Sequence, residues 1–256
     1  MYNKSSNWEF QMTNIQTTKT RRVLESVKNK HYNKPVTGFV LQKGSNYNNE
    51  LMVVGRAVNG WLKDEIKCDC FNDSNKVDEY IKILNGDSEN GCHLAWVVDI
   101  WNNPSPGTRY ITRRSAFWRI VKKVTLSLKI PIQNDERWSS YLIWSNLYKV
   151  SPHKAGNPTK SLINAQQNSC IELLKAEIEV NKPKRVLMMT GSLWAQPFVD
   201  HLNGKPTKID DNEIIKSNFF YTHEDGFQTQ IVVVDHPQGK PESVMVEKIV
   251  AAQNVK

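Results

Sequence analysis

Continuous runs of apolar residues are the clearest pattern in the sequence. Five segments have the length and composition of β-strands: Thr37–Leu41, Leu51–Gly55, Leu142–Leu147, Val186–Thr190 and Gln230–Asp235. The last four are continuous apolar runs, which are typical of strands covered on both faces of a parallel sheet. The pattern therefore predicts a central, mostly parallel, four-stranded sheet.

Helical periodicity appears between and after these strands. Apolar residues recur at helical spacing in four segments: Arg114–Lys129, Ile163–Val180, Ser192–Leu202 and Pro241–Gln253. Strands that alternate with helices favour an α/β fold. We therefore expect a three-layer α/β/α sandwich, with helices on both faces of the sheet.

Two parts of the chain depart from this alternation. Residues 1–35 are predicted to form an N-terminal polar arm and one helix around Arg21–Lys30, ahead of a single α/β domain over residues 36–256. Residues 61–110 are predicted to be an insertion, because they hold three of the four cysteines and an acidic stretch. This insertion either packs over the entrance of a site or is a plain surface elaboration.

Charge and cysteine content narrow the classes of partner. The formal net charge is +8 and the pI is near 9.2, which suits a polyanion such as DNA. No stretch approaches the roughly 20 apolar residues that span a membrane, and the polar N-terminus lacks a signal-peptide core, so we expect a cytoplasmic protein. Cys68 and Cys70 are spaced as Cys-x-Cys rather than Cys-x-x-Cys, so we expect no metal site.

Ligands of parallel α/β sheets bind beyond the carboxyl ends of the strands, which here selects four loops. In the last loop, His236-Pro237 follows an apolar strand that the proline terminates. An imidazole held there could donate a hydrogen bond to an anionic leaving group. A turn histidine without a chemical role is the alternative interpretation.

The other three strand ends also carry polar or glycine residues. The carboxamide of Asn146 has a donor and an acceptor, so it can pair with the edge of a pyrimidine or satisfy loop backbone instead. Gly55 permits close backbone approach to a ligand, and Asn59-Gly60 after it is also a common turn. Ser192 is a natural N-cap, and such a helix start can hold a phosphate.

Taken in this order, the four segments resemble the uracil-DNA glycosylase superfamily. Asn146-Leu147-Tyr148-Lys149-Val150-Ser151-Pro152, followed by Gly156-Asn157-Pro158, is similar to the Asn-Val-Val-Lys-Cys-Arg-Pro segment of its iron–sulfur-containing family. Gly191-Ser192 with Ala195-Gln196 is similar to the Gly-Ser-x-Ala-Gln of the main bacterial and human family, and His236-Pro237 matches the His-Pro-Ser motif. The resemblance covers about residues 140–250 and 51–61.

The resemblance implies that the protein flips a base out of DNA and hydrolyses its N-glycosidic bond. His236 would stabilise the departing base, and Asn146 would read its edge. Tyr110, in a segment similar to the family's Phe-Val-Gly-Arg, would stack under the base, with Trp61 as the alternative. The implied substrate-binding residues are Gly55, Arg56, Tyr110, Asn146 and Trp61.

Two departures from the family concern catalysis and cofactors. The family's first motif places an Asp, Asn or Glu that orients the attacking water, and here the first such side chain is Asn59, with Asp64 or backbone carbonyls as alternatives. Cys170 matches one cluster ligand, but Val150 replaces another and no N-terminal Cys-x-x-Cys exists. The resemblance therefore implies an enzyme without an iron–sulfur cluster or any other cofactor.

The DNA-contacting residues also follow from the resemblance. Ser192 would contact a phosphate, and Gln238 or Lys240 would wedge into the duplex because His-Pro-Gln-Gly-Lys replaces His-Pro-Ser. Arginine and lysine side chains near the motifs are candidates for DNA backbone contacts, or else ordinary solvated charges. They are Arg113, Arg114 and Lys149.

The expected substrate is uracil or a C5-modified cytosine, such as the hydroxymethylated or glucosylated cytosines of some phages. The tyrosine that excludes C5 substituents in the main family has no counterpart at Asn59-Gly60, unless Trp61 turns inward. No lysine stands in a motif position for Schiff-base chemistry, so we expect a monofunctional glycosylase that leaves an abasic site. The alternative is a catalytically silent relative that binds nucleic acid; DNA is the only partner expected.

Overall fold

The chain folds into two compact units, each built from segments that are not consecutive in the sequence. The computed structural model describes residues 4–28, 32, 34–60, 65–86, 92–133, 135–154, 156–203 and 213–254, with the side chains of residues 4–13 excepted. Unit 1 comprises Met1–Val40, Arg56–Asp87 and Asn146–Asn181, and unit 2 comprises Leu41–Gly55, Ser88–Ser145 and Lys182–Lys256.

A six-stranded mixed sheet organises unit 2, with only the last residue of β4 assigned to unit 1. Its strands are β2 (Gln42–Lys43), β3 (Leu51–Gly55), β4 (Leu142–Asn146), β6 (Arg185–Met189), β7 (Ile215–Thr222) and β8 (Gln228–Val234), in the order β2-β4-β3-β6-β8-β7. β3, β6 and β8 run parallel, whereas β2 pairs antiparallel with β4 and β7 with β8. Val53, Leu187 and Val232 lie in register and are fully buried, which explains the unbroken apolar runs.

The predicted α/β class is confirmed, but the sheet is larger and more mixed than the four strands expected. The apolar runs predicted four of these strands to within two residues at each end. β7 escaped prediction because it is an edge strand with an irregular mixture of buried and exposed residues. The first predicted strand, Thr37–Leu41, is only partly correct: Thr37 and Gly38 belong to β1 (Val36–Gly38) in unit 1, residues 39–41 are in no strand, and β2 begins only at Gln42 in unit 2.

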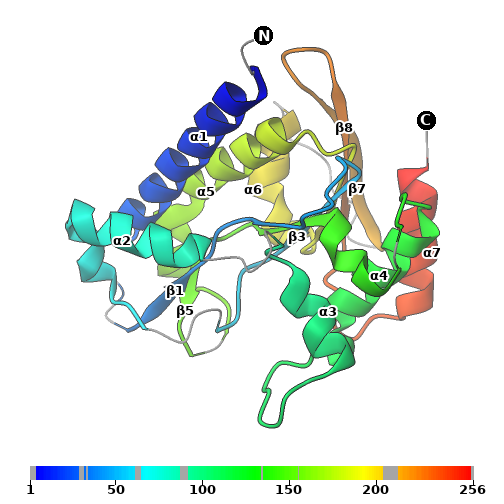
Figure 1. Cartoon of the computed structure of the whole chain (residues 1–256), viewed down its shortest axis with the longest axis horizontal. Coiled ribbons are helices and arrows are strands. Elements are labelled where there is room, and N and C mark those ends of the chain that lie inside the picture. Colours follow the sequence, from blue (N-terminus) through cyan, green and yellow to red (C-terminus); the bar gives the residue numbers. More distant parts are fainter. Residues whose placement is uncertain are drawn as a thin grey trace. The chain divides into compact units, whose positions relative to one another are not determined.

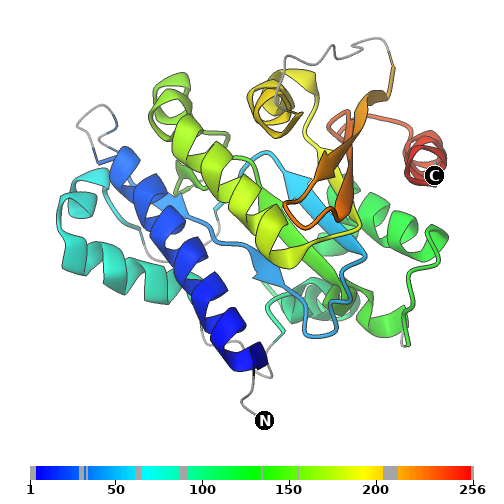
Figure 2. The same cartoon turned by 90° about the horizontal axis from the view of Figure 1, so that it is seen from above.

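Four α-helices in the described part of unit 2 accompany the sheet. They are α3 (Ala95–Asn102), α4 (Ala116–Ser127), α6 (Ser192–Asn203) and α7 (Glu242–Gln253), with 3-10 turns η3 (Thr112–Arg114) and η4 (Asp135–Tyr141). α4 packs against α7, and both α6 and α7 contact β7 and β8. Figure 2 shows α6 and α7 on opposite sides of the β7–β8 pair.

A cluster of tryptophans fixes the helices α3 and α4 on the sheet. The buried ring of Trp118 on α4 meets Trp144 of β4 at 5.3 Å and Trp96 of α3 at 5.8 Å between ring centroids, both edge to face. Such aromatic pairs contribute about 0.5–1.5 kcal/mol each beyond their buried area. They hold in place the segment between α3 and α4, which carries Tyr110.

Unit 1 is mainly helical. It contains α1 (Lys4–Ser26), η1 (Cys68–Asn72), α2 (Ser74–Asn85), α5 (Lys160–Asn181) and a two-stranded antiparallel sheet of β1 with β5 (Val150–Pro152). α1 lies along α5 in both views (Figures 1 and 2). It begins much earlier than the predicted helix and includes most of the predicted polar arm. Its buried apolar residues Val23 and Leu24 lie only near its end, which is the part that the sequence pattern identified.

The predicted insertion at 61–110 is divided between the two units. Its α2 helix buries Val77, Ile81 and Leu84 in unit 1, while α3 belongs to unit 2. The Tyr80 hydroxyl accepts a hydrogen bond from the backbone N–H of Gly38 at 2.7 Å. Each described part of the segment therefore contains a helix that contributes to the packing of its own unit.

Candidate functional site

Three predicted site segments lie at one edge of the sheet in unit 2. β3, β6 and β8 are parallel neighbours, so their carboxyl ends, where Gly55, Gly191 and Asp235 follow, share an edge. The backbone N–H of Gly191 donates to the carbonyl of Val234 at 2.9 Å, which joins the end of β6 to the end of β8. This edge is where the strand-end rule predicts a ligand.

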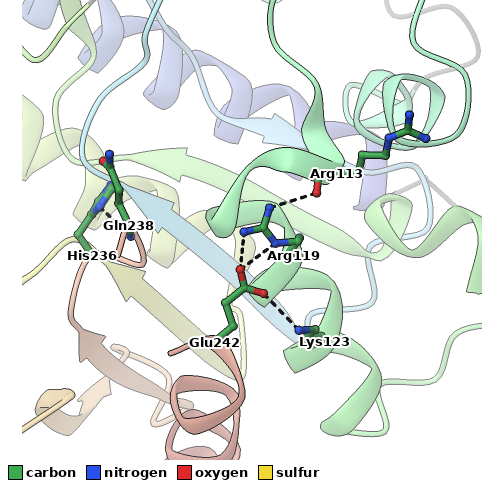
Figure 3. Close-up of polar contacts among 6 residues, drawn as sticks. All are labelled: Arg113, Arg119, Lys123, His236, Gln238 and Glu242. Atoms are coloured by element: carbon green, nitrogen blue, oxygen red, sulfur yellow. Dashed lines mark hydrogen bonds and ion pairs between the residues drawn. The ribbon is translucent and has the colours of Figure 1, made fainter. Parts of the chain in front are cut away.

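The His236 loop, defined as Asp235–Pro241, connects β8 to α7 at this edge. His236 is half-buried, and its Nδ1 accepts a long hydrogen bond of 3.4 Å from the backbone N–H of Gln238, as Figure 3 shows. A neutral imidazole that accepts at Nδ1 carries its proton on Nε2, so Nε2 is a donor. The local geometry therefore suits the donor role predicted for His236.

Ion pairs shape the start of the same loop. The Asp235 carboxylate pairs with Lys216 at 3.4 Å and with Lys240 at 2.8 Å. Lys240 keeps 43% of its side chain exposed, and Gln238 is exposed. The two wedge candidates therefore differ: Gln238 projects from the loop tip, whereas the ammonium group of Lys240 is held by a carboxylate.

Ser192 begins α6 but is not its N-cap. Gly191, at φ +77°, precedes the helix, and its carbonyl accepts from the backbone N–H of Ala195 at 3.2 Å. The N-cap expectation for Ser192 was therefore wrong by one position, because the Gly191 carbonyl already accepts the first hydrogen bond of the helix. The neighbouring Leu193 is 88% exposed and was not singled out from the sequence.

The basic segment, defined as Arg109–Arg114, exposes positive charge in unit 2. Residues 100–134 contain seven Lys or Arg and no Asp or Glu. Arg109, Arg113 and Arg114 are exposed, and the Oγ1 of Thr112 anchors the segment by donating to the carbonyl of Val97 at 2.8 Å. The segment therefore has the charge that a phosphate backbone attracts.

Tyr110 combines an exposed ring with a fixed hydroxyl end. The residue is 49% exposed, and its ring lies 6.4 Å from that of Trp96 between centroids. Burial raises the pKa of Tyr110, whose hydroxyl hydrogen-bonds to the side chains of Ser115 and Trp118. A half-exposed aromatic residue that is held at its hydroxyl end has the form of a stacking platform.

In unit 1, Asn146 ends β4 as a buried and incompletely paired amide. The residue is 1% exposed, and its Nδ2 has no hydrogen-bond partner among the residues that the structure describes. An unmade buried hydrogen bond costs about 1–3 kcal/mol. Buried polar atoms of this kind are uncommon, and each requires an explanation.

The backbone after Asn146 is held by one side chain of α5. Gln166 Oε1 accepts from the backbone N–H groups of Lys149 at 3.0 Å and Val150 at 2.9 Å. Its Nε2 donates to the carbonyl of Val150 at 2.7 Å. One fully buried amide therefore satisfies three backbone groups just after the strand end.

Lys149 is buried in an ion pair and is not exposed for the DNA contact predicted for it. Its side chain is 1% exposed, and its ammonium group donates to both carboxylate oxygens of Glu177, at 2.8 and 2.9 Å. The expectation that Lys149 contacts DNA was wrong, as was the alternative of a solvated charge, because Glu177 pairs with it inside unit 1. Nearby Cys170 is buried, and this burial raises its pKa to about 12.

The loops after β3 and β4 are hydrogen-bonded to each other within unit 1. The backbone N–H of Tyr148 donates to the carbonyl of Arg56 at 3.0 Å, and Ser151 Oγ donates to that of Val58 at 2.8 Å. Asn59 Oδ1 accepts from the backbone N–H of Gly156 at 2.7 Å. Asn59 therefore ties two loops together, which uses one lone pair of the oxygen predicted to hold the attacking water.

Two of the predicted site residues lie outside the described residues, and the search for a metal site concerns the described residues alone. Trp61 and Asp64 lie outside the residues that the structure describes. The four cysteines are free thiols. Within the described part of the chain, no group of three or more His, Cys, Asp or Glu side chains could hold a metal ion, and no helix is long and apolar enough to cross a membrane.

Sequence reasoning missed the residues that hold the loops. Gln166, Arg119 and Glu242 carry no local signal, because the role of each depends on a partner far away in the sequence. Glu177 alone left a trace, as an acid directly before Ile178 on the apolar face of α5.

No family model matches the sequence, and no curated protein matches it.

Proposed function

We propose that the protein is a monofunctional DNA glycosylase, which flips a pyrimidine out of DNA, hydrolyses its N-glycosidic bond and leaves an abasic site. The observation that carries the proposal is Asn146, a buried amide at a strand end whose Nδ2 lacks a partner among the described residues. A flipped pyrimidine would supply the missing hydrogen bond. In this proposal the fold is a three-layer sandwich of the uracil-DNA glycosylase type, with β4, β3, β6 and β8 as its inner strands.

Asn146 would read the base through paired hydrogen bonds. With uracil, Nδ2 donates to O4 while Oδ1 accepts from N3–H; with cytosine, the flipped amide donates to N3 and accepts from the exocyclic amine. An asparagine therefore suits both uracil and a C5-modified cytosine. An aspartate at the same place keeps only acceptors, so it would retain the contact to the cytosine amine but not the donor to O4.

His236 would stabilise the base as it departs with the bonding electrons. As the glycosidic bond breaks, the sugar becomes oxocarbenium-like and negative charge develops on the base. The Nε2–H donor that the Gln238 contact favours would bind that charge. Water would complete the reaction at the sugar, oriented by Asn59 or by loop carbonyls, and the products are an abasic site and the free base.

Exposed groups in unit 2 would bind the DNA. Arg113 and Arg114 would contact phosphates, and the Tyr110 ring would stack on the flipped base. Leu193, as an exposed apolar side chain beside Ser192, joins Gln238 and Lys240 as a wedge candidate, since apolar residues are the usual wedges between base steps.

The test uses oligonucleotides that each contain one candidate base, namely uracil, thymine, 5-hydroxymethylcytosine or glucosylated 5-hydroxymethylcytosine. After incubation with the protein, alkali cleaves any abasic site. We expect cleavage with uracil or a modified cytosine, and loss of about 10²–10³-fold in rate for His236→Ala and Asn146→Ala, the usual cost of a positioned electrostatic group. Asn157→Ala, an exposed asparagine in the loop after β5, is the matched control.

A catalytically silent nucleic-acid-binding relative is the second candidate. The hydrogen bond from Gly156 to Asn59 favours it, because the expected water-holding side chain is engaged in the loop. This candidate predicts salt-dependent DNA binding without an abasic product on any base. A protein that neither binds nor cleaves the oligonucleotides would contradict both candidates.

A further inference from the structure

One arginine of α4 connects two segments of unit 2 that are far apart in the sequence. The Nη1 of Arg119 donates to the backbone carbonyl of Arg113 at 3.2 Å, at the end of the basic segment. Its Nε donates to Glu242 Oε1 at 2.8 Å, and its Nη2 contacts the same oxygen. Figure 3 shows Arg119 between the His236–Gln238 turn and Arg113, whose own side chain points away from it.

Glu242 places the other end of this connection directly after the His236 loop. It is the first residue of α7 and follows Pro241, which ends the loop. Its second oxygen pairs with Lys123 at 3.2 Å, so the carboxylate is held from two successive turns of α4. A carboxylate in the first turn of a helix is also stabilised by the helix dipole. The beginning of α7 is therefore fixed on α4.

We propose that Arg119 is a positioning residue that sets the alignment of the basic segment with the His236 loop. The role rests on the proposed function, in which the basic segment holds the DNA and His236 acts on the departing base. A guanidinium suits it because its donors diverge in one rigid plane, so that one side chain satisfies a carbonyl and a carboxylate together. A lysine at position 119 has a single nitrogen and cannot reproduce this fork.

The contacts of Arg119 should affect the relative position of the two segments more than the overall stability of the protein. The Arg119 side chain is 34% exposed and Glu242 is 20% exposed, and ion pairs as accessible as these stabilise proteins only slightly. Their geometric effect is larger, because a displacement of about 1 Å between a bound substrate and a catalytic group can cost about 100-fold in rate.

Hydrogen–deuterium exchange tests the alignment without any assumption about activity. We expect Arg119→Lys to raise amide exchange about two- to fivefold in both 109–114 and 236–242, the change for one partly exposed ion pair. Glu242→Gln should do the same from the other end. Lys123→Ala is the matched control: Lys123 contacts the same carboxylate without reaching Arg113, so its loss can raise exchange in 236–242 but should leave exchange in 109–114 at the wild-type level. Exchange in Arg119→Lys that rises in only one segment, or exchange in the control that rises equally in both segments, overturns the proposal.

Single-turnover excision then tests the role in the reaction. Arg119→Lys should lower the excision rate about 10- to 100-fold with little change in the Kd for the same oligonucleotide, whereas Lys123→Ala, which leaves the contact to Arg113 in place, should lower the rate clearly less. Weaker binding at an unchanged rate would assign Arg119 to DNA contact and overturn the positioning role. If the wild-type protein excises no base, the proposed function fails, and the exchange measurement alone decides whether Arg119 aligns the two segments.

Discussion

The two loop regions that carry the predicted chemistry are anchored in opposite ways. In unit 1, the backbone after Asn146 is held by the buried amide of Gln166 and the buried Lys149–Glu177 pair. In unit 2, the His236 loop is followed by Glu242, whose partners Arg119 and Lys123 remain partly exposed. One anchor is enclosed and the other is in contact with solvent.

The difference has an energetic meaning. A buried pair pays a large desolvation cost, so its net contribution is small while both charges are present, but removal of one partner leaves a charge that nothing compensates. A solvent-accessible pair contributes about 0–1 kcal/mol and is screened by salt. Loss of one partner of the buried pair should therefore destabilise the Asn146 region strongly. The stability of the His236 region should instead change only gradually with salt concentration and pH.

Breaking the buried pair should have the largest effect. We expect Glu177→Gln to lower the free energy of unfolding by about 3–5 kcal/mol, because the Lys149 ammonium stays buried without its carboxylate. Urea unfolding measures this loss. Glu172→Gln on the same helix, where an exposed carboxylate pairs with Lys19, is the control and should cost less than about 1 kcal/mol.

A double variant tests whether the loss of stability comes from the uncompensated charge of Lys149. Lys149→Met with Glu177→Leu removes both charges and should recover most of the lost stability. If Glu177→Gln behaves like the Glu172 control, the Lys149–Glu177 pair is not enclosed in solution, and the contrast between the two anchors disappears.

Removal of the Gln166 amide should have an intermediate effect. Gln166→Ala leaves the N–H groups of Lys149 and Val150 and the carbonyl of Val150 without this partner, at about 1–3 kcal/mol for a buried group left unpaired. Thermal and urea unfolding report the change. The adjacent Gln167→Ala, which removes only the 3.3 Å contact from the Tyr148 hydroxyl, should cost clearly less. Equal costs would mean that Gln166 is not the main tether.

The smallest expected effect is the change with pH in the stability that the solvent-accessible Arg119–Glu242 pair contributes. The hydrogen bond from Arg119 holds the pKa of Glu242 below its ordinary value of 4.5. A carboxyl whose pKa is lowered by folding adds stability above its unfolded pKa and loses it as the pH falls through the folded value. The stability difference between wild type and Glu242→Gln, at most about 1 kcal/mol at pH 7, should therefore shrink as the pH falls below about 4.5.

Urea titrations at several pH values measure this difference. Ser243→Ala, an exposed and uncharged neighbour in the first turn of α7, controls for disturbance of the helix start. A difference that stays constant from pH 7 to pH 3 would show that the Glu242 charge does not contribute to stability.

The sequence predicted the parts of the fold that depend on local burial. Leu51–Gly55 is the strand β3 without any shift, because every residue in it is buried and the apolar run is unbroken. The edge strand β7 was missed, since a strand paired on one side only needs no such run. The four helices predicted from apolar spacing, α4, α5, α6 and α7, were placed to within three residues at each end. The helix α1 is longer than predicted, because its polar first half gives no periodic signal, and α2 and α3 were not predicted within the segment interpreted as an insertion.

The positions of the candidate site residues were predictable only where a strand end identified them. Gly55, Gly191 and His236 reached one sheet edge because parallel strands end together. Lys149 was misjudged because its environment depends on Glu177, 28 residues later, and the Arg119–Glu242 contact joins positions 123 residues apart. Apart from the position of Glu177 beside the apolar face of α5, pairings at such distances leave no trace in a local pattern.

The interleaving of the two units governs the order in which the chain can fold during synthesis. The chain changes unit after residues 40, 55, 87, 145 and 181, so unit 1 has all of its residues only when position 181 has emerged. β3 must then wait for β6, whose Arg185 pairs with Leu51, before its second edge is covered. Long-range parallel pairing of this kind forms slowly and leaves apolar strands exposed meanwhile. The nascent protein is therefore most prone to aggregate between the synthesis of β4 and that of β8.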